Sequence, residues 1–192
     1  MPQTLLPVQV KIVDPRLREF GGAPRPATGG SAAVDVVALG AYRRKPDGKP
    51  DMTSREPIAD KIVIAPGEVC FVGLGFAMHI GDPGYAAFLM PRSGMGSALG
   101  IVMANTVGLI DSDYQNEVVA ALWNRNFPAT GEPLRVSLAG DPPLPRGAVE
   151  IRAGDRVAQM YLAPVVLPEW REVEEFGRVT ERGLGGFGST GA

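Results

Sequence analysis

The sequence predicts an all-β fold built from many short strands, and three observations support this. Gly (25 residues) and Pro (18 residues) are spread through the 192 residues as turn signals between short apolar runs. Many of those runs are rich in Val, Ile and aromatic residues, which favour strands. Helical periodicity is nearly absent, and only residues 93–99 suit a short helix. A β-barrel or sandwich forming a single domain over residues 1–192 is therefore expected.

The strand candidates follow one another along the chain. Residues 8–13 alternate apolar and polar side chains, as a strand with one buried face does. The later candidates are short apolar runs bounded by turn residues, at 34–38, 61–64, 69–80, 85–90, 107–110, 118–123, 134–138, 148–151 and 157–166. Two polar, proline-containing stretches, 42–57 and 127–147, interrupt this series. We expect both to be surface insertions rather than domain boundaries, because strand-like sequence resumes after each.

Composition and charge exclude several function classes. The formal net charge is -2, so no basic field favours polymeric nucleic acid as a partner. The only cysteine, Cys70, lies in an apolar run, which rules out a disulfide within the chain and predicts a buried core residue. No export signal and no apolar run of membrane-spanning length is evident. We therefore expect a cytoplasmic protein with no membrane partner.

The glycine-rich C-terminal segment, residues 182–192, combines backbone freedom with side chains that could bind a ligand. Such a segment has little to bury, so we expect a mobile arm. It nevertheless carries a cation, Arg182, an aromatic ring, Phe187, and the hydroxyls of Ser189 and Thr190. These groups are suited to closing over a phosphorylated aromatic ligand; the alternative is a frayed tail without a function.

In residues 105–117 an apolar strand runs into an acidic turn, and the chain leaves this turn into the strand candidate 118–123, which is the pattern of a β-hairpin. Asp111 and Asp113 would flank its tip, where a carboxylate can bind a metal or orient a water. Tyr114 could lie against a ring, and the amide of Asn105 could read the edge of a nucleobase. The alternative is that the two Asp residues only stabilise a turn.

A second polar group precedes the expected short helix. Ser93 and Gly94 lie at its beginning, and Arg92 stands beside them. Free backbone N–H groups, a hydroxyl and a guanidinium could together bind an anion. The alternative is an ordinary Ser N-cap with a neighbouring surface Arg.

Two polar residues interrupt apolar strands and therefore need partners. Asp35 lies in the candidate at 34–38, and Gln159 lies in the candidate at 157–166. A carboxylate in such a strand is costly unless it is paired or hydrogen-bonded. Asp35 could hold a neighbouring Arg or face a hydrated metal, and Gln159 could bind a ligand or be a satisfied core residue.

Taken in order, these blocks resemble the five motifs of the trimeric all-β dUTPases, which hydrolyse deoxyuridine triphosphate. The resemblance spans residues 31–191 and rests on 31–38, 91–101, 105–117, 154–159 and 182–191. It implies a distorted β-barrel of jelly-roll type with one short helix and a flexible C-terminal arm. It also implies a homotrimer in which each active site is shared between subunits.

The family resemblance also implies a reaction and residue roles. The substrate would be dUTP and the products dUMP and pyrophosphate, which limits uracil in DNA and supplies dUMP for thymidylate synthesis. Asp111 would activate the attacking water. Mg²⁺ would be held mainly through the substrate phosphates, with Asp35 as a water-mediated contact. Substrate binding is implied for Arg92, Ser93, Gly94, Asn105, Gly108, Tyr114, Gln159, Arg182, Phe187, Gly188, Ser189 and Thr190.

Two features depart from the family pattern. Asn116 stands where the family usually has Gly, and residues 97–99 are less polar than is common there. Asn is the residue best able to replace Gly at a positive φ, so we expect the turn to survive. The competing functions are a dCTP deaminase or bifunctional deaminase–dUTPase of the same fold, and a nucleotide-sensing trimer that binds a partner protein.

Overall fold

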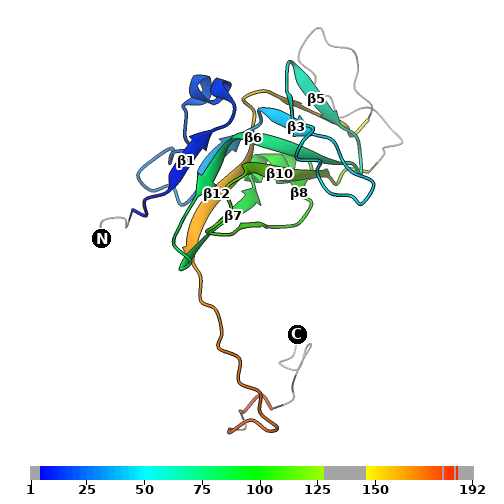
Figure 1. The fold of residues 1–192 in the computed structure, drawn as a ribbon. Helices are drawn as coiled ribbons and strands as arrows, with labels where there is room; N and C mark the ends of the chain where they lie inside the picture. Colours follow the sequence, from blue (N-terminus) through cyan, green and yellow to red (C-terminus); the bar gives the residue numbers. More distant parts are fainter. Residues whose placement is uncertain (1–4, 128–145, 179, 184, 186–192) are drawn as a thin grey trace.

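A computed structural model describes residues 5–127, 146–178, 180–183 and 185 (Figure 1). This part of the chain forms twelve strands, one α-helix, α1 (Ser93–Ala98), and one 3-10 helix, η1 (Pro15–Phe20). The predicted all-β class and the single short α-helix are thus confirmed, whereas η1 was not predicted. None of the described helices is long and apolar enough to span a bilayer.

The strands form three antiparallel sheets. The largest has the order β4 (Glu56–Pro57), β3 (Gly40–Tyr42), β6 (Val69–His79), β10 (Glu117–Asn124), β8 (Ile101–Met103), with β1 (Gln9–Ile12) also paired to β6. The second has the order β2 (Val34–Val37), β12 (Arg156–Pro164), β7 (Tyr85–Pro91), β9 (Gly108–Ile110). The third pairs β11 (Val149–Arg152) with β5 (Lys61–Ile64).

Strand β6 organises the largest sheet. Its central residues, 72–78, are all buried, because it pairs with β10 on one edge and with β3 and then β1 on the other. The change of partner occurs at Gly75, which has φ 79° and accepts hydrogen bonds from the N–H groups of Val13 and Asp14. A left-handed residue at this point favours Gly and lets the sheet change partners without losing backbone hydrogen bonds.

The hairpin predicted from residues 107–110 and 118–123 is wrong. Strand β9 pairs with β7 in the four-stranded sheet, and β10 pairs with β6 and β8 in the six-stranded sheet. The turn at 111–116 therefore carries the chain from one sheet to the other. An apolar–polar–apolar pattern specifies a reversal of the chain, but it does not specify which strand each arm will pair with.

The segment at 42–57 begins and ends inside the largest sheet. Strands β3 and β4 pair through Gly40–Pro57 and Ala41–Glu56, and neither strand was predicted. Tyr42 is buried, and the residues between the two strands form a hairpin closed by a bridge between Arg44 and Pro50. Most of the other predicted stretch, 127–147, and the strand expected at 134–138 lie outside the described residues.

A cluster of charged side chains is buried where η1, β3, β6 and β10 meet. The carboxylate of Glu117, 2% exposed, accepts from Arg55 Nε at 2.6 Å and from the hydroxyl of Tyr42. Arg55 Nη2 also reaches Asp14, which forms a bidentate pair with Arg16. Burial and the neighbouring carboxylate raise the pKa of Tyr42, so its hydroxyl stays a donor.

The chain after β12 leaves the body of the molecule (Figure 1). The N–H of Val165 bonds to the carbonyl of Gly84, and the described residues beyond it contain no helix or strand. Val166, Leu167, Trp170 and Phe176 are all at least 80% exposed. Large apolar side chains are rarely left uncovered in such a row, so this segment has the composition of an interface.

Asp14 makes a stability contribution that depends on pH. Hydrogen bonds from Arg16 lower the pKa of its carboxyl from 3.8 to about 2. The stabilisation is therefore present above pH 4 and is lost as the pH falls from about 4 through 2. We expect Asp14→Asn to reduce the free energy of unfolding by about 2 kcal/mol at pH 7 and by much less at pH 2.

Urea unfolding at pH 7, 4, 3 and 2, at one protein concentration, checks this expectation. Asp47→Asn is the matched control, because the Asp47–Lys49 pair is exposed and pairs of this kind contribute little. A difference between Asp14→Asn and the unsubstituted protein that stays constant across this pH range would contradict the proposed ionic contribution.

Candidate active site

Strand β7 separates two cavities. Successive residues of a strand point to opposite faces of its sheet. Leu89 lies opposite Gly108 of β9 and lines one cavity, whereas the next residue, Met90, lies opposite Gln159 of β12 and lines the other. The two cavities share no lining residue, and we call them the turn cavity and the sheet cavity, respectively.

The turn cavity, with a volume of about 240 Å³, gathers the residues predicted from the 105–117 block. Asn105, Gly108, Asp111 and Tyr114 all line it. Apolar side chains from β7, β9 and β10 complete the wall together with two residues of the 42–57 segment; these are Leu89, Leu109, Ile110, Val118, Val119, Pro50 and Met52. A mainly apolar cavity with a few convergent polar groups is typical of a small-molecule site.

A tight turn places Asn105 and Gly108 at this cavity. Thr106 has φ 61°, and the N–H of Val107 bonds to the carbonyl of Asn105 at 2.7 Å. A Cβ at Gly108 would lie 3.1 Å from the Cβ of Leu89 and 3.6 Å from Nδ2 of Asn105. Gly108 therefore keeps open the space beside the Asn105 amide, and a larger residue would narrow it.

Asp111 and Tyr114 belong to the turn that joins the two sheets. Tyr114 is half-buried, its N–H bonds to the carbonyl of Asp111 at 3.2 Å, and its hydroxyl donates to the carbonyl of Glu117 at 2.8 Å. Burial, and to a lesser degree the charge of Glu117, raises the pKa of Tyr114. Among the described residues no side chain bonds to the exposed Asp111 carboxylate, which leaves both of its oxygens available to water or a ligand.

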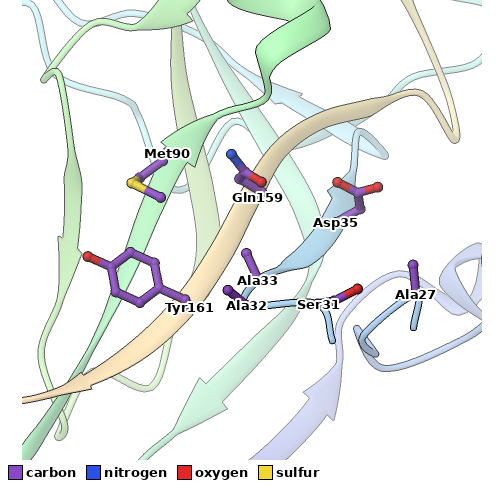
Figure 2. Close-up of a pocket in the computed structure, with 8 residues that line it drawn as sticks. All are labelled: Ala27, Ser31, Ala32, Ala33, Asp35, Met90, Gln159 and Tyr161. Atoms are coloured by element: carbon purple, nitrogen blue, oxygen red, sulfur yellow. The ribbon is translucent and has the colours of Figure 1, made fainter. Parts of the chain in front are cut away.

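The sheet cavity, about 570 Å³ in volume, lies over β2 and β12 and contains two of the predicted polar residues (Figure 2). Gln159 faces Asp35 across the β2–β12 ladder and Met90 across the β12–β7 ladder. The Gln159 amide donates to the carbonyl of Pro91 at 3.0 Å. Gln159 is thus fixed by a backbone partner while its side chain still lines the cavity.

Asp35 holds two guanidinium groups. Its Oδ1 accepts from Arg92 Nε at 2.6 Å, and its Oδ2 accepts from Arg156 Nη1 at 3.2 Å. Arg92 was predicted as a binding residue, but Arg156 was not singled out. The position of Arg156, three residues before Gln159 and at the start of the same strand, was the available signal. Asp35 therefore positions positive charge beside the sheet cavity.

The remaining predicted binding residues lie at helix α1 and in the C-terminal segment. Ser93 and Gly94 are exposed in the first turn of α1, whose N-cap is Arg92 without a side-chain capping bond. The alternative interpretation of Ser93 as the N-cap is therefore wrong. Arg182 is exposed, and its Nε donates to the carbonyl of Gly185 at 3.0 Å. Phe187, Gly188, Ser189 and Thr190 lie outside the described residues.

Cys70 and His79, the cysteine and the histidine of the chain, do not line either of these two cavities. Cys70 is partly buried and packs against the core rather than inside it as predicted, and burial raises the pKa of its thiol to about 11. His79 contacts Gln9 on β1. Within the described ranges no group of three or more His, Cys, Asp or Glu side chains could hold a metal ion. The available chemistry is therefore a free carboxylate beside one cavity and guanidinium groups beside the other.

Comparison with known proteins identifies the family of this all-β chain. The dUTPase family model matches residues 57–128 and 145–191. The deoxyuridine 5'-triphosphate nucleotidohydrolase of Hydrogenovibrio crunogenus is 40% identical over 185 residues, or 96% of this chain and 97% of that protein. The enzyme of the same name from Escherichia coli is 38% identical over 184 residues, again 96% and 97% of the two chains. This chain belongs to the dUTPase family.

Solved structures give the same fold. The dUTPase of Staphylococcus bacteriophage 80alpha with dUPNHPP superposes with a TM-score of 0.74 at 25% identity, covering 97% of this chain and 99% of that one. A mutant dUTPase from phage phi11 of S. aureus superposes with a TM-score of 0.65 at 22% identity, covering 90% and 99%. The second likeness concerns the fold alone.

Proposed function

We propose that this protein hydrolyses dUTP to dUMP and pyrophosphate, with the base and sugar in the turn cavity. The observation that carries the proposal is the convergence of Asn105, Gly108, Asp111 and Tyr114 on one cavity, with the Asp111 carboxylate free of partners in the described chain. The relatives are named for this reaction, and the phage 80alpha enzyme is described with dUPNHPP.

In the turn cavity each residue has a distinct task. The Asn105 amide offers both a donor and an acceptor to the edge of uracil. Gly108 keeps the space beside the Asn105 amide open, so the base can approach that amide closely, and this close fit disfavours a 5-methyl group. Tyr114, held by its bond to Glu117, packs under the deoxyribose and disfavours a 2′-hydroxyl.

Asp111 activates the water that attacks the α-phosphorus. Its carboxylate accepts a hydrogen bond from the water, orients it in line with the leaving pyrophosphate, and takes its proton as the new P–O bond forms. The bond that breaks joins the α-phosphorus to the α,β-bridging oxygen. No covalent intermediate with the protein is needed, which agrees with the absence of a described Cys or His at the cavity.

The triphosphate is bound by groups predicted at the sheet cavity and at α1. Arg92 is held in place by Asp35, and Gln159 by the carbonyl of Pro91, so both are preorganised. Ser93 and Gly94 offer a hydroxyl and backbone N–H groups at the end of β7. The predicted arm adds Arg182, Phe187, Gly188, Ser189 and Thr190, with Phe187 stacking on the base.

The described residues do not form a Mg²⁺ site of their own. Both oxygens of Asp35 face guanidinium groups, and the described chain has no group of three or more His, Cys, Asp or Glu side chains that could hold a metal ion. The phage phi11 protein is described as coordinating a structural Mg(II) ion. We propose that Mg²⁺ would be held mainly through the substrate phosphates and would neutralise part of their charge. A water-mediated contact with Asp35 remains a prediction.

We propose further that the enzyme is a homotrimer with shared sites. The turn cavity and the sheet cavity share no lining residue, so one chain holds the proposed base-binding and phosphate-binding groups in separate places. A shared site would combine the turn cavity of one chain with phosphate-binding groups of another. The exposed apolar row from Val166 to Phe176 is a suitable contact for a neighbour and would carry the arm across to it.

The substrate assignment is tested by measuring pyrophosphate release from dUTP, dTTP, dCTP and UTP, with Mg²⁺ and with EDTA. We expect release from dUTP at a rate at least about 100-fold above the other three, because the cavity selects on the base edge, the 5-position and the 2′-position. Ammonia release from dCTP would instead indicate a deaminase or bifunctional enzyme. Tight dUTP binding without pyrophosphate would indicate a nucleotide sensor.

Asp111→Asn is expected to lower kcat by roughly 100- to 10,000-fold while dUTP binding changes little, because the amide fills the same space but cannot accept the proton. Single-turnover pyrophosphate release and calorimetric titration with dUTP measure the two effects. Asp113→Asn is the matched control, because Asp113 lies in the same exposed turn but does not line the cavity. Turnover at the normal rate in Asp111→Asn would refute this role.

Truncation after Glu181 is expected to leave a folded trimer with very low activity, because it removes the arm. Coexpression of this truncation with Asp111→Asn should produce mixed trimers whose activity exceeds that of either variant by at least about tenfold. The reason is that a shared site can take Asp111 from one chain and the arm from another. Mixed trimers, verified by two affinity tags, that remain inactive would contradict the sharing of sites.

A further inference from the structure

Residues 43–57, which we call the wall segment, form one side of the turn cavity. Pro50 and Met52 line this cavity together with Asn105 and Asp111, although more than fifty residues separate the two groups in the sequence. Met52 is neither fully buried nor fully exposed, as expected for a side chain at the edge of an open cavity. The dUTPase family match begins at residue 57, so the wall segment up to residue 56 lies outside that match.

Internal hydrogen bonds hold the wall segment in a defined shape. The Asp51 carboxylate accepts from the N–H and the hydroxyl of Thr53 at 3.1 and 2.7 Å. The N–H of Asp51 bonds to the carbonyl of Arg43, and the N–H of Arg43 bonds to the hydroxyl of Ser54. These bonds flank Met52 on both sides, so its backbone position is fixed relative to strands β3 and β4.

Arg55 attaches this segment to the largest sheet. It donates from Nε and Nη2 to Glu117 and from Nη2 to Asp14. The sheet leaves room for these groups through two glycines that face each other across β3 and β6: a Cβ at Gly40 would lie 2.8 Å from Arg55 Cζ, and one at Gly73 would lie 2.8 Å from Glu117 Oε1. The missing side chains of these two glycines therefore leave the space that the Arg55–Glu117 ion pair occupies.

The same carboxylate that anchors the wall segment also anchors the turn carrying Asp111. Glu117 is the first residue of β10; its carbonyl accepts from the hydroxyl of Tyr114, and its Oε1 accepts from the N–H of Gly75. The β6–β10 register shifts between Glu117 and Val119, and bulges of this kind often direct side chains near active sites. The wall segment and the turn are thus fixed to one buried group from two sides.

We infer that the wall segment is part of the nucleotide site: Met52 contacts the bound nucleoside, and Arg55 is a positioning residue that holds Met52 opposite Asp111 and Tyr114. This inference rests on the proposed function, because it assumes that the turn cavity binds the nucleoside. A flexible thioether side chain packs well against a ring or a sugar face and excludes water from it. The segment predicted as a surface insertion then contributes to substrate affinity.

The first test is Met52→Ala. Loss of the apolar contact should raise KM for dUTP and the Kd for dUMP by about three- to tenfold, with kcat nearly unchanged. Lys49→Ala is the control within the same segment, because the side chain of Lys49 is 78% exposed and does not line the cavity. If KM and Kd of Met52→Ala match those of Lys49→Ala, the contact does not exist and the inference fails.

The second test asks whether Arg55 acts through Met52. Arg55→Lys keeps the charge but loses the fork that reaches both Glu117 and Asp14, and Arg43→Lys makes the same change in the exposed Arg43–Glu56 pair. In a double-mutant cycle we expect Met52→Ala to raise KM less than twofold in the Arg55→Lys background but by its full factor in the Arg43→Lys background. Equal factors in both backgrounds would refute the positioning role.

These outcomes are distinct from a failure of the proposed function. If the unsubstituted protein releases no pyrophosphate from dUTP, the proposed function fails, whatever the variants do. If it is active and Met52→Ala leaves KM and the Kd for dUMP unchanged, only the present inference fails. Should Arg55→Lys not fold, Met52→Ala still decides the contact, since a half-exposed loop side chain can be truncated with little effect on the core.

Discussion

One buried carboxylate, that of Glu117, constrains much of the structure around the site. A buried charge is tolerated only where partners satisfy it, and Glu117 has Arg55, the hydroxyl of Tyr42 and the N–H of Gly75. Those partners come from the wall segment, β3 and β6, so meeting the requirement of one charge brings three separate elements together. The left-handed conformation of Gly75 and the missing side chain of Gly73 are both part of this arrangement.

The pleat of β7 determines how the chemistry is divided. Adjacent residues of one strand, Leu89 and Met90, belong to different cavities, and each faces its own partner strand. The groups proposed to bind the nucleoside and the polar pair Asp35–Gln159 therefore line separate cavities. The proposed homotrimer with shared sites would allow one active site to use groups of both kinds.

The sequence predicted the strands and turns that depend on local pattern. It did not predict which distant segments pair with one another. Alternation and apolar runs located long strands such as β6 and β12, but the two-residue strand β4 and the three-residue strand β3 have too little pattern to be seen. The 111–116 turn was found, yet its strands were paired wrongly, because pairing is decided by the whole sheet. Asp35 was predicted either to hold a neighbouring Arg or to face a hydrated metal, and the structure pairs it with two Arg residues, of which Arg156 was not singled out. The contribution of Met52 to the turn cavity had no sequence signal. We infer that Met52 is held there by the ion pair between Arg55 and Glu117, and these two residues are 62 positions apart in the sequence.

Asp35 and Asp111 show why a role cannot be assigned from residue type alone. Asp35 lies within β2 and Asp111 directly follows β9, and the sequence left a metal role open for both and a water role open for Asp111. Asp35 is engaged by two guanidinium groups, so its charge is largely compensated and it serves to hold those groups in place. A guanidinium bound on one side still has N–H donors free on another, so the same groups can also bind a phosphate. Asp111 has no such partner in the described chain, so both of its oxygens are open to water, as the proposed role of general base requires. The environment thus separates a carboxylate that holds two guanidinium groups from one that no side chain engages.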